Sequence, residues 1–355
     1  MGDCALNDAY HALIRGNRTG LGPTLQRAGL WGLSLGYRLG VAWRNQAFDR
    51  NWKKIHRAAV PVVSVGNVTV GGTGKTPCVE FVARFFRQLG LQVTLLSRGY
   101  GSEVGRNDEA LVLEENLPDV PHLQGADRAA LAMTAVEELE SDILVLDDGF
   151  QHRQLHRDLD IVLIDATCPW GHGHLLPRGL LREPIGSLKR ANVVILTRCD
   201  LVPPEVVQGI RDTVRRIKPE LPIVESTHRP AQWCNASQKK AALEALQGRP
   251  IAGFCGLGNP DAFRQTLLNL GLKLTAWRTY PDHHAYTRAD IESLRGWARQ
   301  LPADAAVVTT QKDLVKIRLD QLGEKDLWAL HIQLQMTSGQ EALEEMLQRT
   351  IKAQG

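Results

Sequence analysis

Several features that would assign a 355-residue chain to a special class are missing from this sequence. The six cysteines form no C-x-x-C pair, which argues against a zinc site or a disulfide framework and favours reduced thiols in a cytoplasm. The formal net charge is only +3, so the total charge gives no reason to expect nucleic-acid binding. The N-terminus lacks a basic stretch followed by an apolar core and a cleavage site, so export is not expected.

A hydrophobic run long enough to cross a bilayer is also missing from the most apolar segment, residues 22–48. A spanning helix needs about 20 largely uncharged residues, and the longest uncharged run here, Ala28 to Tyr37, is about half of that length. Leucines and tryptophans alternate with arginines, and RNWKK follows at 50–54. This pattern is typical of a helix in the membrane interface. A helix packed on the protein's own core would look similar, so both interpretations remain open.

From residue 60 onwards, short apolar runs alternate with helical patterns, which predicts an α/β fold with a mainly parallel sheet. A second alternating set begins near residue 250, after a stretch without clear periodicity. We expect an N-terminal membrane-associating segment at 1–50, a core domain at 51–222 and a smaller α/β domain at 223–355. The strands expected in the core domain are VPVVSVG (60–66), QVTLLS (92–97), DILVLDD (142–148), DIVLIDA (160–166) and NVVILT (192–197).

The stretch SVGNVTVGGTGKTPCVEF at 64–81 joins an apolar strand to a helix through a glycine-rich loop. Such a loop directs several backbone N–H groups at one point and suits a phosphate group. A lysine can then reach the outer phosphates, and a threonine hydroxyl can bind magnesium. The loop departs from the strict P-loop motif, because Thr69 stands at the position of the motif's first glycine. The predicted nucleotide-binding residues are Gly71, Gly72, Thr73, Gly74, Lys75 and Thr76.

Two acidic residues, Asp147 and Asp148, follow the apolar strand ILVL. A nucleotide site of this kind needs an acid at the end of a neighbouring strand to hold the metal, so the pair strengthens the prediction of a phosphate and magnesium site. The same loop serves ATPases, GTPases and kinases, and it does not identify the phosphoryl acceptor. LTRCDL at 196–201 is weakly similar to a guanine-reading motif, but Arg198 replaces its lysine.

Six blocks follow one another along the chain: VPVVSVGNVTVGGTGKTP, LLSRGYG, NDEALVL, LDDGFQHRQLHRDLDIVLID, LLPRGLLREP and YPDHHAYT. Together they resemble the tetraacyldisaccharide 4'-kinase family of lipid A biosynthesis. The resemblance covers about residues 24–316. It implies a P-loop kinase domain with a second, smaller α/β domain, ATP and Mg²⁺ as cofactors, and phosphorylation of the 4'-hydroxyl of an acylated glucosamine disaccharide. It also implies a peripheral protein on the cytoplasmic face of the bacterial inner membrane. The segment TTQKDLVKI lies at the C-terminal end of the match.

Individual roles follow from the same resemblance. It places Lys75 on the phosphates and Asp148 in catalysis, and it adds Asp108 and His283 as an acceptor-side pair. Because these two come from different expected domains, domain closure would assemble them and exclude water. The implied magnesium ligands are Thr76, Asp147 and Glu183, and His152 is a further catalytic residue in the cleft.

Two alternatives concern the acceptor-side pair. Asn107-Asp108-Glu109-Ala110 departs from the family's usual Gly-Asp-Glu-Pro, so Glu109 or Asp127 could take the place of Asp108. His284 could act instead of His283.

The arginines of LLPRGLLRE, Arg178 and Arg182, could neutralise substrate phosphate or be solvated. The rival interpretation of the whole chain is a regulatory or assembly P-loop NTPase. That class would need a protein partner, whereas the kinase needs its lipid and a membrane surface and no obligatory protein partner is evident.

Overall fold

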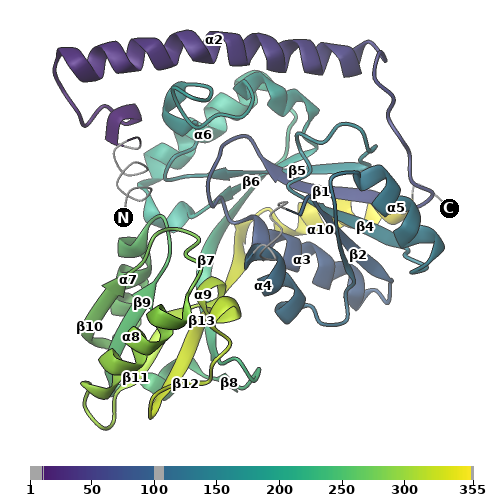
Figure 1. Ribbon diagram of the computed structural model, residues 1–355. Helices are drawn as coiled ribbons and strands as arrows, with labels where there is room; N and C mark the ends of the chain where they lie inside the picture. Colours follow the sequence, from purple (N-terminus) through teal and green to yellow (C-terminus); the bar gives the residue numbers. More distant parts are fainter. Residues whose placement is uncertain (1–9, 11, 100–107, 353–355) are drawn as a thin grey trace. The chain divides into compact units, whose positions relative to one another are not determined.

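The computed structural model describes residue 10 and residues 12–99 and 108–352 (Figure 1). The chain divides into two compact units. Unit 1 holds the N-terminal part, Leu117–His228 and the C-terminal segment from Leu334. Unit 2 combines Arg229–Gln333 with the segment that ends at Asn116.

These units divide the chain differently from the expected domains. Helix α2 (Leu21–Asp49), from the expected separate segment 1–50, belongs to unit 1, and the stretch of unit 1 that begins at Leu117 runs to His228 instead of residue 222. Unit 2 ends before the expected domain 223–355 does, because strand β13 (Lys325–Ser338) continues into unit 1 and helix α10 (Gln340–Lys352) belongs there. Helix α4 (Asp108–Asn116), which was expected in the core domain, belongs to unit 2. Chain order predicts neither of these last two changes, since both arise from packing between segments far apart in sequence.

Unit 1 is built on a parallel sheet in the order β7-β6-β5-β1-β4-β2-β3. The strands expected in the core domain are confirmed. Their central residues are buried, as is required of strands that are covered on both faces. Helices α3 and α5 pack on the sheet. The strands are β1 (Val62–Asn67), β2 (Val93–Ser97), β3 (His122–Gln124), β4 (Ile143–Asp147), β5 (Leu159–Asp165), β6 (Val193–Thr197) and β7 (Ile223–Cys234), and the helices are α2 (Leu21–Asp49), α3 (Lys75–Gln88), α5 (Arg128–Glu137) and α6 (Pro204–Ile217).

Unit 2 has its own parallel strands in the order β10-β9-β11-β13, with β12 antiparallel to β13. Its core contains Phe254 and Leu294 in one cluster and Trp233 and Leu267 in another. The strands are β8 (Lys240–Ala241), β9 (Pro250–Cys255), β10 (Lys273–Thr279), β11 (Ala306–Thr310) and β12 (Gln321–Leu322), and the helices besides α4 are α7 (Pro260–Asn269), α8 (Arg288–Arg299) and α9 (Gln311–Ile317).

Strand β7 lies in the region where the sequence shows no periodicity. Its buried positions alternate only at its start, and several of its side chains are polar and half-buried. The strand was therefore missed, because a strand signal depends on apolar alternation.

Helix α2 is one long, uninterrupted helix in Figure 1. Only Ser34, Val41, Ala47 and Phe48 of this helix are buried. Most of its large apolar side chains are exposed instead, with Leu25 and Leu39 both at 72%. One narrow face of α2 thus packs on the rest of unit 1, while most of its other positions are exposed. Among the described residues, none of the helices has the length and apolarity that crossing a membrane requires.

Candidate functional site

The glycine-rich loop follows β1 directly and ends where α3 begins at Lys75. Gly71 and Gly74 have φ of 118° and 88°, in the left-handed region that favours glycine. A Cβ at Gly74 would lie 2.4 Å from Nε2 of His228, so the backbone also needs glycine there for space. The loop therefore has the conformation that its glycines predict.

Side chains from neighbouring strands hold this loop in place. Asn67 donates to Oγ1 of Thr73 over 2.8 Å, and Thr197 donates to the Thr73 carbonyl over 2.9 Å. Arg198 donates to the carbonyl of Gly72 over 2.8 Å and also pairs with Asp165. Arg198 thus supports the phosphate loop. Sequence reasoning considered it only as a guanine reader.

A lysine, an aspartate and an arginine meet beside the loop. Nζ of Lys75 lies 3.6 Å from Oδ1 of Asp148, and Arg182 donates to both carboxylate oxygens of Asp148 over 2.8 Å. Burial alone would raise the pKa of Asp148, but the two cations outweigh it and hold the pKa below its usual range. Asp148 is therefore an anion at neutral pH. Asp147 ends β4 next to Val65 of β1 in the parallel register.

The residues present fit a nucleotide and a magnesium ion. The loop offers backbone N–H groups at the start of a helix, and the Lys75 ammonium suits phosphate. Thr76 and Asp147 supply the hydroxyl and carboxylate oxygens that Mg²⁺ prefers. Among the described residues, no group of three His, Cys, Asp or Glu side chains could hold a metal. Phosphate oxygens complete the magnesium shell in P-loop sites, so two protein ligands suffice.

Glu183 has a different environment from the one its predicted role requires. The side chain is fully buried, and its carboxylate accepts hydrogen bonds from Arg44 over 2.7 Å, Arg190 over 2.8 Å and Asn45 over 3.2 Å. Both oxygens are thus engaged by groups that would compete with a cation. The geometry supports a role for Glu183 in anchoring α2. Magnesium ligation by Glu183 stays a prediction that these contacts do not support.

His152 lies beside Arg128, whose Nη1 is 3.0 Å from Nδ1 of the imidazole. Burial, reinforced by the guanidinium groups of Arg128 and Arg157, lowers the pKa of His152 to about 4. Because a guanidinium only donates, Nδ1 accepts and the ring proton of neutral His152 is on Nε2. His152 is therefore a hydrogen-bond donor at neutral pH, not a base.

The predicted acceptor-side pair forms within unit 2. Nδ1 of His283 lies 2.9 Å from Oδ2 of Asp108. Burial would raise the pKa of Asp108, but the His283 hydrogen bond and the ammonium groups of Lys312 and Lys316 lower it to about 2. The hydrogen bond to Asp108 in turn raises the pKa of His283. The expectation that domain closure assembles this pair is wrong, because α4 and His283 belong to the same unit.

The alternative residues have other partners. His284 contacts Asp290 over 3.1 Å, and Asp290 belongs to the capping box of α8. Glu109 pairs with Lys312 over 2.7 Å. Asp127 caps α5 by accepting from the backbone of Ala129 and Ala130. Asp108 and His283 are thus the two residues that meet.

The two arginines of LLPRGLLRE have separate roles. Arg182 binds Asp148, as described above. Arg178 donates through Nη1 to the carbonyl of Ile14 and through its backbone N–H to Ser34. Arg178 therefore ties down the N-terminal part of the chain.

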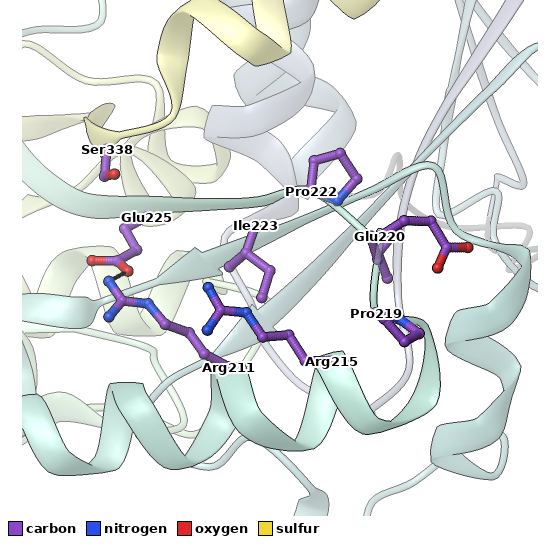
Figure 2. A pocket seen from close by; sticks show the side chains of 9 residues that line it. Arg211, Arg215, Pro219, Glu220, Pro222, Ile223, Glu225 and Ser338 are labelled. Atoms are coloured by element: carbon purple, nitrogen blue, oxygen red, sulfur yellow. Dashed lines mark hydrogen bonds and ion pairs between the residues drawn. The ribbon is translucent and has the colours of Figure 1, made fainter.

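One hollow in unit 1, about 340 Å³ in volume, contains no residue that the sequence singled out (Figure 2). It lies between α6 and the start of β7, and its lining is mainly polar. Arg211 forms an ion pair with Glu225 inside it. Arg215 and Ser338 also line it.

Comparison with known proteins gives concordant results. A family model described as tetraacyldisaccharide-1-P 4'-kinase matches residues 26–352. The tetraacyldisaccharide 4'-kinase of Anaeromyxobacter dehalogenans (strain 2CP-C) is 43% identical over 303 residues, which cover 79% of each chain. That of Anaeromyxobacter sp. (strain Fw109-5) is 38% identical over 357 residues, covering 95% of this chain and 93% of the relative. The crystal structure of LpxK from Aquifex aeolicus in complex with ATP superposes with a TM-score of 0.75 at 28% identity, covering 92% of this chain and 99% of that chain.

Proposed function

Because the chain belongs to the tetraacyldisaccharide-1-P 4'-kinase family, we propose that it transfers the γ-phosphoryl group of ATP to the 4'-hydroxyl of a tetraacyldisaccharide 1-phosphate. The observation that carries the proposal is the phosphate loop with Lys75 beside Asp148, in a chain that matches the family from residue 26 to 352. ATP and Mg²⁺ are the cofactors, and a solved relative contains ATP.

In the phosphate site, the backbone of Gly71–Gly74 and the ammonium of Lys75 would bind the phosphate oxygens of ATP. Thr76 and Asp147 would hold magnesium, which would supply positive charge against the negative charge of the phosphate groups. Asp148 keeps Lys75 close to the loop, since the two lie 3.6 Å apart. Arg182 holds Asp148 from the other side and limits its freedom to rotate.

On the acceptor side, the Asp108–His283 pair would accept the proton of the attacking sugar hydroxyl. Asp108 is buried with its side chain 6% exposed, whereas the His283 side chain is 58% exposed and open to a substrate. Asp108 is ionised, so Nδ1–H of His283 donates to it, and in the neutral imidazole Nε2 has a lone pair that can accept a proton. A regulatory NTPase has no need for such a pair, because water is its only acceptor.

The exposed apolar face of α2 has a use in this function. The acyl chains of the substrate keep it in a bilayer, so the enzyme must come to the membrane surface. Leu25, Leu39 and Trp43 would enter the acyl boundary, and the basic residues near the end of α2 would meet lipid phosphates. Peripheral association with the cytoplasmic face of the inner membrane is thus part of the proposal.

The phosphate loop belongs to unit 1 and the Asp108–His283 pair to unit 2. Neither unit alone therefore carries all the groups that the proposal assigns to the reaction.

A radiolabel transfer assay tests the function directly. The purified full chain is incubated with γ-labelled ATP, Mg²⁺ and a detergent-dispersed acylated glucosamine disaccharide 1-phosphate. Label should enter the lipid, and Lys75→Met should abolish the transfer. Release of free phosphate at a rate that the lipid does not change would instead favour the regulatory NTPase.

A further inference from the structure

Helix α9 contacts both ends of α4 in unit 2. Nε2 of Gln311 donates to Oδ1 of Asn116 over 3.1 Å at the C-terminal end of α4. Nζ of Lys312 donates to Glu109 over 2.7 Å at the N-terminal end. One helical turn after Lys312, on the same face of α9, Nζ of Lys316 lies 3.5 Å from Oδ2 of Asp108.

The same helix also holds the segment that carries His283, through Asp313. This carboxylate is completely buried, and it accepts from the hydroxyl of Tyr286 over 3.0 Å and from the backbone N–H of Gly256 over 3.1 and 3.2 Å. Thr310 adds a hydrogen bond of 2.7 Å. A buried charge is tolerated only with such partners, so Asp313 fixes the position of Tyr286 relative to α9.

Tyr286 in turn packs against residues on both sides of His283. The rings of Tyr280, His284 and Tyr286 pack together with centroid distances of 4.9 to 5.1 Å. His283 lies inside this segment with φ of 56°, a left-handed conformation that is uncommon for residues other than glycine. The direction of the His283 side chain therefore depends on its neighbours.

Lys316 links these two sets of contacts, those of α9 with α4 and those of Asp313. Its Nζ lies 3.5 Å from Oδ2 of Asp108 and 3.7 Å from Oδ1 of Asp313. Oδ2 of Asp108 is the same oxygen that contacts His283, while Oδ1 accepts from the backbone N–H of Glu109. Asp108 is thus held on both oxygens, and without Lys316 its carboxylate gains freedom to turn away from the imidazole.

We propose that α9 is the scaffold that orients the Asp108–His283 pair and that Lys316 is the positioning residue through which it holds Asp108. The proposal rests on the function proposed above for the pair, and it deepens that function by naming what aligns the proton acceptor. Lys316 acts through Asp108, since its side chain is only 15% exposed and lies between two carboxylates. The resemblance that singled out TTQKDLVKI assigned no role to any of its side chains.

The test measures the titration of the His283 imidazole by NMR in the full chain, with the signal identified by its loss in His283→Gln. The charged groups that face His283 are Asp108, Asp282 and Lys312, and those that face Asp108 are His283, Lys312 and Lys316. If Lys316 positions Asp108, then Lys316→Met weakens the hydrogen bond and the His283 midpoint falls towards its ordinary value. If Lys316 acted only by its charge, removing a cation would raise the midpoint.

Lys316→Arg keeps a cation at the site and should keep the wild-type midpoint. Lys273→Met, on an exposed side chain at the opposite end of β10 from the His283 turn, is the matched control and should change nothing. An unchanged or raised His283 midpoint in Lys316→Met overturns the proposal, provided that the variant keeps the wild-type circular dichroism spectrum.

Kinetics give an independent readout. Lys316→Met should lower kcat for transfer to the lipid about 100-fold, the size of effect that a small misplacement of a reacting group causes. The KM for ATP should stay unchanged, because the phosphate loop lies in unit 1. A wild-type chain that transfers no label to the lipid would refute the proposed function, yet the His283 titration would still decide whether Lys316 positions Asp108.

Discussion

Arg44 of helix α2 donates a 2.7 Å hydrogen bond to Glu183, whose side chain is completely buried in unit 1. The contact fixes the C-terminal half of α2 to the segment that also carries Arg182, the partner of Asp148. An ion pair thus connects the helix with the open apolar face to the part of the chain that supports the phosphate site.

This contact predicts the effect of Glu183→Gln. The substitution leaves Arg44 and Arg190 without their anionic partner. Because these side chains are 35% and 19% exposed, the cost should stay below the figure of about 3–5 kcal/mol for a fully buried ion pair. We expect the urea midpoint to fall by a corresponding amount and amide exchange in α2 to accelerate. Asp49→Asn is the matched control, because Asp49 pairs with Arg153 from a mainly exposed position and should contribute at most about 1 kcal/mol. Unchanged stability together with a raised magnesium requirement would instead make Glu183 a metal ligand.

Gly74→Ala should disable the phosphate loop. The substitution places a Cβ 2.4 Å from Nε2 of His228 and also strains a backbone with φ of 88°. ATP affinity measured by calorimetry should fall strongly. Gly90→Ala separates the two effects, since φ is 82° there and a Cβ would meet no heavy atom within 4 Å among the described residues. Its cost should be only the backbone strain of about 1–2 kcal/mol, with ATP affinity unchanged. Equal ATP affinities in the two variants would contradict this account.

His283→Ala and His284→Ala should differ in kind. His283 contacts Asp108, so its loss should reduce transfer to the lipid by about 10²–10⁴-fold while the protein stays folded. His284 stacks on Tyr280 and bonds to Asp290, so its loss should lower the unfolding midpoint and reduce transfer less than the loss of His283 does. Steady-state kinetics and thermal unfolding of both variants check the prediction. A fully active His283→Ala enzyme would remove the pair from the mechanism.

The Asp108–His283 pair should also make stability depend on pH. The pKa of Asp108 is lowered from 3.8 to about 2, so its stabilisation is present above pH 3.8 and is lost as pH falls towards 2. The pKa of His283 is raised from 6.5, so its contribution is full below 6.5 and is lost as pH rises through the higher folded value.

The urea midpoints of wild type and Asp108→Asn should therefore differ most between pH 3.8 and 6.5 and converge near pH 2. A difference that is constant from pH 2 to 9 would show that the pair is not charged in the folded protein.

Exposed leucines of α2 should control membrane binding without affecting the fold. Burying a leucine side chain gains about 1.5–3 kcal/mol, so Leu25→Ser or Leu39→Ser should weaken binding to anionic vesicles about tenfold or more. Both residues are 72% exposed, and their replacement should leave the unfolding midpoint unchanged. Leu268→Ser, at an exposed leucine of α7, is the control and should sediment like the wild type. Undiminished sedimentation of the α2 variants would refute interfacial insertion.

Much of the phosphate site could be predicted from the sequence because its signals are local. Buried parallel strands are continuous apolar runs, and such runs identified β1 and β4. The glycines between Gly71 and Thr76 indicate a loop with backbone conformations that favour glycine. Strand β7 was missed, because half-buried polar side chains leave no periodic signal.

The sequence by itself therefore determined the α/β class, the phosphate loop and the acids at the end of β4, since each depends on residues adjacent in the chain. Only the tertiary structure decided that Asp108 joins His283 within unit 2, that Glu183 pairs with Arg44, and that Lys316 approaches Asp108. These contacts join residues separated by 139 to 208 positions. Such pairs form because packing brings distant segments together, and no local pattern in a single sequence records which partner each charge will meet.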